Sequence, residues 1–233
     1  MFDWRNYELE EVTTEDGSPT LRDLQSPNLE TMHHRGGAAT ETLYIYGEAL
    51  QIGLQNQLRQ VWSVGLGCGY NELLVADLHL KNPAWDPQLL SFETRAVLVE
   101  QFVKALVASP REEFYDRVGS SLRVGDLAFK TLFQMKKGGS WRIQGDFLQF
   151  PRTQSCEILL FDAFSAKTDE RLWTPAFLGE LFAAGMNSKS LVVTYACTGH
   201  LKRALKGAGY ELIAKPGFKG RRDSTLAVRG FSL

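Results

Sequence analysis

A glycine-rich loop between an apolar segment and an amphipathic segment constrains the fold of this chain most strongly. Residues 60–64 predict a short buried strand, glycines follow as Gly65, Gly67 and Gly69, and residues 71–80 predict a helix. Glycine suits such a loop because a side chain would keep a ligand away from the backbone. The N–H groups at the start of the following helix favour an anionic ligand group. The unit predicts a nucleotide-type cofactor site in an α/β fold.

The spacing of these glycines favours S-adenosylmethionine over a nicotinamide dinucleotide. A dinucleotide-binding loop carries the pattern G-x-G-x-x-G, and Tyr70 stands where its last glycine would be. A second acidic position after a later strand, at Asp146, points the same way. We therefore expect S-adenosylmethionine as the cofactor.

Three acidic residues follow predicted strands, at the sheet edge where open α/β folds bind ligands. Glu93 is expected to accept hydrogen bonds from the ribose hydroxyls, although it also suits a helix start. Asp146 and Phe147 are expected to contact the adenine amino group and ring, or else to form a turn. Asp162 follows an apolar strand. Burying a carboxylate there is costly, so a functional role is favoured.

Strand and helix patterns alternate along most of the chain. They predict a Rossmann-like α/β fold with a mostly parallel sheet, as in class I methyltransferases. The last two strands, at 210–214 and 224–228, are joined too closely for a crossover helix, so one is antiparallel. Before the domain, residues 7–12 and 20–24 predict a β-hairpin. We expect a hairpin-and-loop appendage at 1–35 and a methyltransferase domain at 36–233. The other strands are expected at 89–92, 141–143, 157–161 and 190–195, and the other helices at 40–56, 94–108, 111–132 (in parts), 174–184 and 199–207.

Composition argues against several other classes of protein. The cysteines Cys68, Cys156 and Cys197 have no C-x-x-C spacing, which predicts reduced thiols in a cytoplasmic protein. The four histidines do not form a ligand pattern, so no metal is expected. The first residues lack a basic and apolar secretory signal, and no apolar run approaches the roughly 20 residues of a membrane span.

The net charge of −1 hides an uneven distribution. Acidic residues dominate positions 1–30 and basic residues dominate positions 200–230. Such asymmetry can mark a surface that binds a polyanion, or simply two solvated surfaces.

Several further segments resemble the methyltransferase domain of the MnmC family, which completes 5-methylaminomethyl-uridine at the wobble position of tRNA. The likeness begins near Asn28. The flavin-dependent oxidase domain of the bifunctional members is not expected in this chain. The segments are 36–46, 162–165 with 172–175, and 194–196, 201–205, 207–210 and 216–222.

The resemblance implies roles for individual residues. Glu41 would help to hold the methionine end of the cofactor, and Asp162 would lie beside the transferable methyl group and contact the substrate amine. The region of Arg221 and Arg222 would face the anticodon stem-loop of tRNA, and Lys219 in the same basic stretch would contact phosphate.

Methyl transfer to an amine needs a neutral nitrogen, and most of the catalysis can come from positioning and desolvation. Asp162 would then orient the amine. Phe164 and Trp173 would stack on a flipped uracil or pack in the core. Tyr195 would line the same pocket or lie buried with its hydroxyl satisfied.

Three functions therefore stay open. The first is methylation of the 5-aminomethyl group of tRNA wobble uridine. The second is a small-amine methyltransferase or a polyamine aminopropyltransferase, because residues 165–171 lack the prolines usual in the MnmC family. The third is a non-catalytic binding module, against which the intact glycines, Glu93, Asp146 and Asp162 argue. The sequence gives no indication of the oligomeric state.

Overall fold

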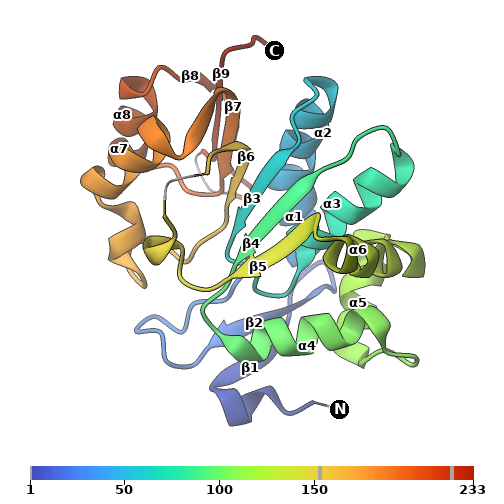
Figure 1. Ribbon diagram of the computed structural model, residues 1–233. Helices are drawn as coiled ribbons and strands as arrows, with labels where there is room; N and C mark the ends of the chain where they lie inside the picture. The colour runs from blue at the N-terminus through green and yellow to red at the C-terminus, as the bar shows by residue number, and fades with distance from the viewer. Residues whose placement is uncertain (1, 152–153, 221–222) are drawn as a thin grey trace.

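Seven strands form one central sheet, and helices cover both of its faces (Figure 1). The computed structural model describes residues 2–151, 154–220 and 223–233. The strand order is β5-β4-β3-β6-β7-β9-β8, in which β9 alone runs antiparallel to its neighbours. This confirms the predicted Rossmann-like methyltransferase fold. The strands are β3 (Gln60–Val64), β4 (Gln88–Phe92), β5 (Trp141–Gln144), β6 (Cys156–Phe161), β7 (Met186–Thr194), β8 (Glu211–Ile213) and β9 (Thr225–Arg229).

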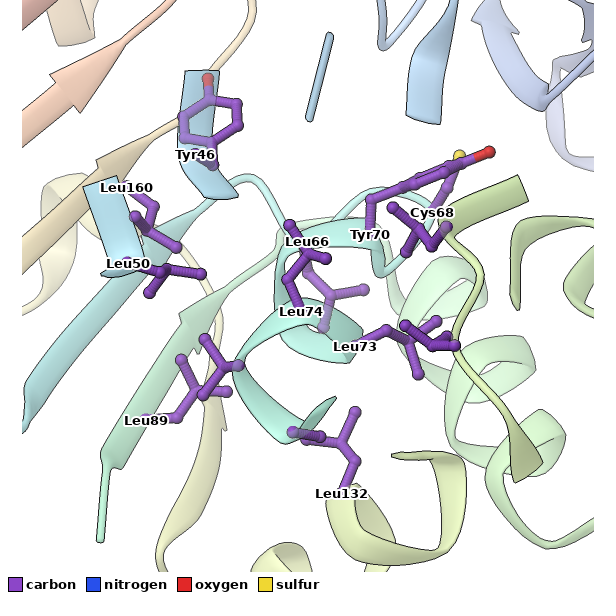
Figure 2. Packing of buried hydrophobic residues seen from close by; sticks show 14 of the residues in the cluster. Tyr46, Leu50, Leu66, Cys68, Tyr70, Leu73, Leu74, Leu89, Leu132 and Leu160 are labelled. Carbon is purple, nitrogen blue, oxygen red and sulfur yellow. The ribbon is translucent and has the colours of Figure 1, made fainter. Parts of the chain in front are cut away.

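Side chains alternate between the two faces of the sheet, as the period of a β-strand requires. From β6, Ile158 and Leu160 join one hydrophobic cluster, whereas Leu159 and Phe161 join the other. Figure 2 shows part of the first cluster, in which Leu160 lies beside Leu50 of a covering helix. Burying each such side chain stabilises the fold by about 2 kcal/mol. The first cluster lies under α1 (Ala38–Thr42), α2 (Glu48–Gln55), α3 (Tyr70–Lys81), α4 (Ala96–Val107), α5 (Glu113–Leu122) and α6 (Asp126–Gly138), and the second under α7 (Pro175–Ala184) and α8 (Gly199–Gly207).

The N-terminal hairpin packs against the helices of the first cluster. It consists of β1 (Leu9–Thr13) and β2 (Pro19–Asp23), preceded by the 3-10 turn η1 (Trp4–Tyr7). Leu9 and Leu21 are fully buried in that cluster, and the Trp4 ring lies 5.4 Å from the Phe114 ring of α5. The hairpin therefore shares the main core.

Two helical segments differ from the sequence expectation. The predicted helix over residues 40–56 contains a π-helical turn, η2 (Leu43–Gly47), between α1 and α2. The helix predicted to end at residue 132 continues as α6 to Gly138. It ends there because Gly139 adopts a left-handed conformation with φ of 83°, a common helix terminator.

Candidate active site

A cavity opens at the carboxyl ends of β3, β4, β5 and β6. The glycine loop forms its floor, and residues 30–34, which follow the hairpin, form one wall. The strand order brings together residues that are far apart in the sequence. The predicted site residues that line the cavity are Glu41, Gly65, Gly67, Glu93, Asp146, Phe147, Asp162, Phe164 and Tyr195.

The three glycines of the loop all have positive φ values of 91°, 51° and 80°. A Cβ on Gly65 would lie 2.6 Å from the Asp162 carbonyl oxygen, and one on Gly69 would lie 2.3 Å from the Phe102 ring. A Cβ on Gly67 would meet only Met32 Sδ, at 3.4 Å. Gly67 therefore borders the cavity. Gly69 does not line the cavity. Its lack of a side chain instead allows the Phe102 ring of α4 to pack against the start of α3.

Glu93 lies half-buried at the end of β4 and accepts hydrogen bonds from the backbone. Its Oε2 accepts from Gly67 N at 3.0 Å, and its Oε1 accepts from Arg95 N at 2.9 Å. Burial raises the pKa of Glu93, although the backbone hydrogen bonds oppose that shift. Each carboxylate oxygen has a second lone pair, so the group can still accept hydrogen bonds from ribose hydroxyls.

Asp146 and Phe147 follow β5 at the same edge. Asp146 Oδ1 accepts from Leu148 N at 2.9 Å and caps the short turn η3 (Phe147–Gln149). The Phe147 ring is 3% exposed and lies 4.6 Å from the Phe92 ring. Asp146 therefore both caps a turn and lines the cavity, and Phe147 adds an apolar side chain to the cavity lining.

Asp162 is half-buried at the end of β6, and both of its carboxylate oxygens have side-chain partners. Tyr46 Oη donates to Oδ1 at 2.6 Å, and Asn71 Nδ2 donates to Oδ2 at 3.0 Å. Burial raises the pKa of Asp162 well above its usual value, and Glu41 adds to that shift, while the two donors oppose it. Sequence reasoning did not single out Tyr46 or Asn71. Asn71 carried a signal, since it lies in the first turn of the helix after the glycine loop.

Glu41 and Glu30 connect the wall of the cavity to its surroundings. Glu41 is 5% exposed, and its Oε2 accepts from His34 N at 2.6 Å. Glu30 accepts from Ser165 N at 3.2 Å, from Ser165 Oγ at 3.0 Å and from Thr168 Oγ1. The segment after the hairpin thus contacts the loop after β6. Neither Glu30 nor His34 was expected at the site.

The predicted substrate aromatics separate into two groups. Phe164 and Tyr195 line the cavity, and Tyr195 Oη donates to the Ala163 carbonyl oxygen at 2.9 Å. Trp173 is 6% exposed, its ring lies 4.8 Å from the Phe161 ring, and its Nε1 donates to the Phe164 carbonyl oxygen at 2.8 Å. The structure therefore places Trp173 in the second hydrophobic cluster, the packing alternative of the prediction.

Of the predicted tRNA-contacting residues, the structure describes Lys219, which does not line the cavity. Lys219 Nζ donates to the Gly36 carbonyl oxygen at 2.6 Å and joins the C-terminal loop to the N-terminal segment. Arg221 and Arg222 lie outside the described residues. Exposed basic side chains also occur on α8, at His200, Arg203 and Lys206.

Acidic side chains outnumber basic ones in the lining of the cavity. Arg95 lines it but pairs with Asp23 at 2.6 Å. A low-dielectric site with an excess of carboxylates favours a cationic ligand. The acidic residues that line it are Glu30, Glu41, Glu93, Asp146, Asp162 and Asp169.

The described residues contain neither a metal-binding cluster nor a membrane-spanning helix. No group of three or more His, Cys, Asp or Glu side chains among them is arranged to hold a metal ion. Within the same residues, no helix is long and apolar enough to cross a membrane.

Comparison with known proteins supports the likeness to MnmC. An uncharacterized protein of Methanocaldococcus jannaschii, MJ0670, is 25% identical over 228 residues, which is 94% of this chain and 59% of that protein. The tRNA 5-methylaminomethyl-2-thiouridine biosynthesis bifunctional protein MnmC of Aromatoleum aromaticum is 33% identical over 74 residues, 31% of this chain and 12% of that protein. The chain thus spans less than two thirds of either relative.

The fold has a close counterpart among solved structures. MnmC2 of Aquifex aeolicus superposes with a TM-score of 0.70 and 20% identity, covering 97% of this chain and 72% of that one. Residues 141–230 match the family described as S-adenosyl-L-methionine-dependent methyltransferase. The segment 141–230 is thus similar to S-adenosyl-L-methionine-dependent methyltransferases, and the fold of the chain resembles that of MnmC2.

Proposed function

We propose that the enzyme methylates the 5-aminomethyl group of tRNA wobble uridine to give 5-methylaminomethyl-uridine. The observation that carries this proposal is the Asp162 carboxylate, which two side-chain donors hold inside an acidic cavity. A carboxylate in such a place suits an amine acceptor. The A. aromaticum relative, whose name places it in biosynthesis of the same tRNA nucleoside, supports the choice of tRNA.

The residues of the cavity fit S-adenosylmethionine. The part of the cavity beside Gly65 and Gly67, near the start of α3, suits the methionine carboxylate. Glu41 suits the methionine ammonium group, and Glu93 suits the ribose hydroxyls. Asp146 and Phe147 suit the adenine amino group and ring. Together these residues would hold S-adenosylmethionine in the cavity that Asp162 also lines.

The bound cofactor supplies an electrophilic methyl group on a sulfonium sulfur. The substrate ammonium first gives a proton to water, so that its nitrogen has a lone pair. Asp162 would accept an N–H hydrogen bond from this amine and orient its lone pair. S-adenosylmethionine, when bound, would supply the methyl group, and transfer would form the N–C bond while the S–C bond breaks with its electron pair left on sulfur. Asp162 and Glu41 then stabilise the positive charge that develops on nitrogen.

The tRNA side of the reaction needs a base-binding surface and phosphate contacts. Phe164, which lines the cavity, offers a face on which the flipped uracil can stack. The exposed basic side chains of α8, which starts shortly after the end of β7, are suited to phosphates. Methylation of tRNA should therefore weaken as salt rises.

The test is transfer of labelled methyl groups to tRNA that carries 5-aminomethyl-uridine, with fully modified tRNA as the control. Incorporation restricted to the aminomethyl tRNA is expected. Equal labelling of both tRNAs, or labelling of free amines and polyamines alone, would overturn the proposal and favour a small-amine transferase.

A further inference from the structure

The carboxylate of Asp162 is held by donors from two separate elements. Tyr46 comes from the π-helical turn η2 and Asn71 from the first turn of α3. Both are buried, with 1% and 3% of their surfaces exposed. One donor reaches each carboxylate oxygen, at 2.6 Å from Tyr46 and 3.0 Å from Asn71. The plane of the carboxylate is therefore set from both sides.

The π-helical turn explains how Tyr46 reaches this position. In a regular α-helix, residues five apart differ in direction by about 140°, which would turn Tyr46 away from the side of Glu41. A π-helical turn takes up an extra residue and commonly occurs at functional sites. Here the turn begins two residues after Glu41 and contains Tyr46, whose hydroxyl donates to Asp162. The charge of Glu41 acts on both Tyr46 and Asp162, so the three groups are close enough to interact.

The surroundings of Tyr46 keep its hydroxyl a donor. Figure 2 shows its ring beside Leu50 and Leu160, with the oxygen directed away from both leucines. Burial raises the pKa of Tyr46 well above its usual value, and the neighbouring Asp162 adds to the shift. The hydroxyl is therefore protonated at any working pH and aimed at Asp162.

Asn71 connects the same carboxylate to the cofactor loop. It is the second residue of α3, directly after the glycine loop, and its side chain reaches across to the end of β6. The position of Asp162 is thereby coupled to the loop that would hold the methionine end of the cofactor.

We propose that Tyr46 and Asn71 are positioning residues that orient the Asp162 carboxylate toward the acceptor amine. The inference rests on the proposed amine methylation. Each carboxylate oxygen has two lone pairs, so one protein donor on each leaves a second acceptor position. Asp162 lines the cavity, and these positions are therefore offered to the N–H groups of an amine.

A change in this arrangement should alter the pH dependence of turnover. The titratable groups that act on Asp162 or on its partner Tyr46 are Glu41, Glu72, Cys68 and Tyr195. The hydrogen bonds from Tyr46 and Asn71 lower the pKa of Asp162 against its burial. Removal of either donor should raise that pKa, so that the acid limb of the rate profile moves to higher pH.

The first variant is Tyr46→Phe, measured with 5-aminomethyl-uridine tRNA across pH. We expect kcat to fall about tenfold or more, because a hydrogen bond to a charged group is lost. The acid limb should move to higher pH, and the Kd for S-adenosylmethionine should change less than about twofold. Tyr44→Phe is the matched control, since it removes a hydroxyl from the same turn that bonds only to Pro216 O in the described structure.

The second variant is Asn71→Asp, which is nearly isosteric and replaces the donor with a second carboxylate. An acid near a helix N-terminus is favourable, so the fold should be retained. Repulsion should displace the acid limb further than in Tyr46→Phe. Thermal unfolding of each variant separates a loss of structure from a loss of orientation.

A measurement that needs no methyl acceptor tests the role of Tyr46 and Asn71 separately from the proposed function. The titration of the Asp162 carboxyl carbon can be followed by NMR in the cofactor-bound protein, with Asp162→Asn to assign the signal. A higher pKa in Tyr46→Phe and an unchanged one in Tyr44→Phe support the positioning role, even if the wild type fails to methylate tRNA. Identical titration and superimposable rate profiles for Tyr46→Phe and wild type would overturn it.

Discussion

Two acids stand on either side of the central strand β3, and the protein holds them in different ways. Glu93 follows β4 and Asp162 follows β6, the two neighbours of β3 (Figure 1). Burial raises the pKa of both carboxyl groups. Glu93 accepts hydrogen bonds from backbone N–H groups, whereas Asp162 accepts them from the side chains of Tyr46 and Asn71.

The hydrogen bonds to the two acids depend on the sequence to different degrees. The donors to Glu93 belong to loops that any sequence with this backbone would supply. The donors to Asp162 depend on side-chain identity at two positions, 116 and 91 residues away. Single substitutions can therefore dissect the surroundings of Asp162, while at Glu93 only the acid itself can be changed.

The largest effect is expected for Asp162→Ala. Turnover should fall by about 10²–10⁴-fold, since the orienting group for the amine is lost. Binding of S-adenosylmethionine should weaken but stay detectable. Steady-state kinetics and calorimetry with the same preparation measure the two effects. Wild-type turnover in this variant would remove Asp162 from the mechanism.

A smaller and different effect is expected for Glu93→Gln. The amide keeps the shape but loses the charge-assisted hydrogen bonds to hydroxyls. The Kd for S-adenosylmethionine should rise about tenfold or more, with kcat at saturating cofactor within a few-fold of wild type. Calorimetry measures the Kd. If kcat falls strongly while the Kd stays constant, Glu93 does not bind the cofactor, and its proposed difference in role from Asp162 is wrong.

The contrast between Glu93 and Asp162 also shows how much of the fold and of the site could be predicted from the sequence. The alternation of apolar strands with helices predicted the sheet, and the short connection between the last two strands predicted its antiparallel strand. The positions of Glu93 and Asp162 after strands predicted that both acids lie at the ligand-binding edge. Tyr46 was missed because a helical periodicity of 3.6 residues does not reveal a π-helical turn. Glu30 was missed because its partner Ser165 lies 135 residues away. Trp173 was considered for substrate binding but packs in the core. The sequence near a motif does not distinguish an aromatic residue that packs in the core from one that binds substrate.

A third buried acid, Glu72, offers a test of stability. It does not line the cavity, and it accepts from Ser91 Oγ at 2.8 Å. Burial raises the pKa of Glu72 from 4.5 to about 7. The folded state therefore binds its proton more tightly than the unfolded state does, and the free energy of unfolding should fall as pH rises from 4.5 to about 7.

The variant Glu72→Gln should lack this pH dependence. Relative to the variant, the wild type should lose roughly 3 kcal/mol of unfolding free energy between pH 4.5 and pH 8. Urea denaturation at several pH values measures the difference. Glu180→Gln, at an exposed position on α7, is the control and should show a constant difference. A constant difference for Glu72→Gln as well would show that Glu72 is ionised in the folded protein.

The smallest effect is expected at Asp16, in the hairpin turn. Its Oδ2 accepts from Thr40 N at 3.0 Å and from Thr40 Oγ1 at 2.8 Å, so it caps α1, the helix that carries Glu41 and leads to Tyr46. Burial raises the pKa of Asp16, but hydrogen bonds from Ser18, Thr14 and Thr40 outweigh it and lower the pKa overall. The stabilisation is therefore present above pH 3.8 and is lost as pH falls below it.

Asp16→Ala should lower the free energy of unfolding by about 1 kcal/mol, the usual value of a helix cap. Because α1 carries Glu41 and leads to Tyr46, turnover should fall by a few-fold, while the Kd for S-adenosylmethionine should rise by a smaller factor, since Glu93 is held on the other side of β3. Glu15→Ala, next to Asp16 and exposed, should change neither quantity. Thermal unfolding, kinetics and calorimetry on the pair decide the matter. If Asp16→Ala instead raises the Kd as much as it lowers turnover, the hairpin supports both acids equally, and the separation between the two sides of β3 does not extend beyond the cavity.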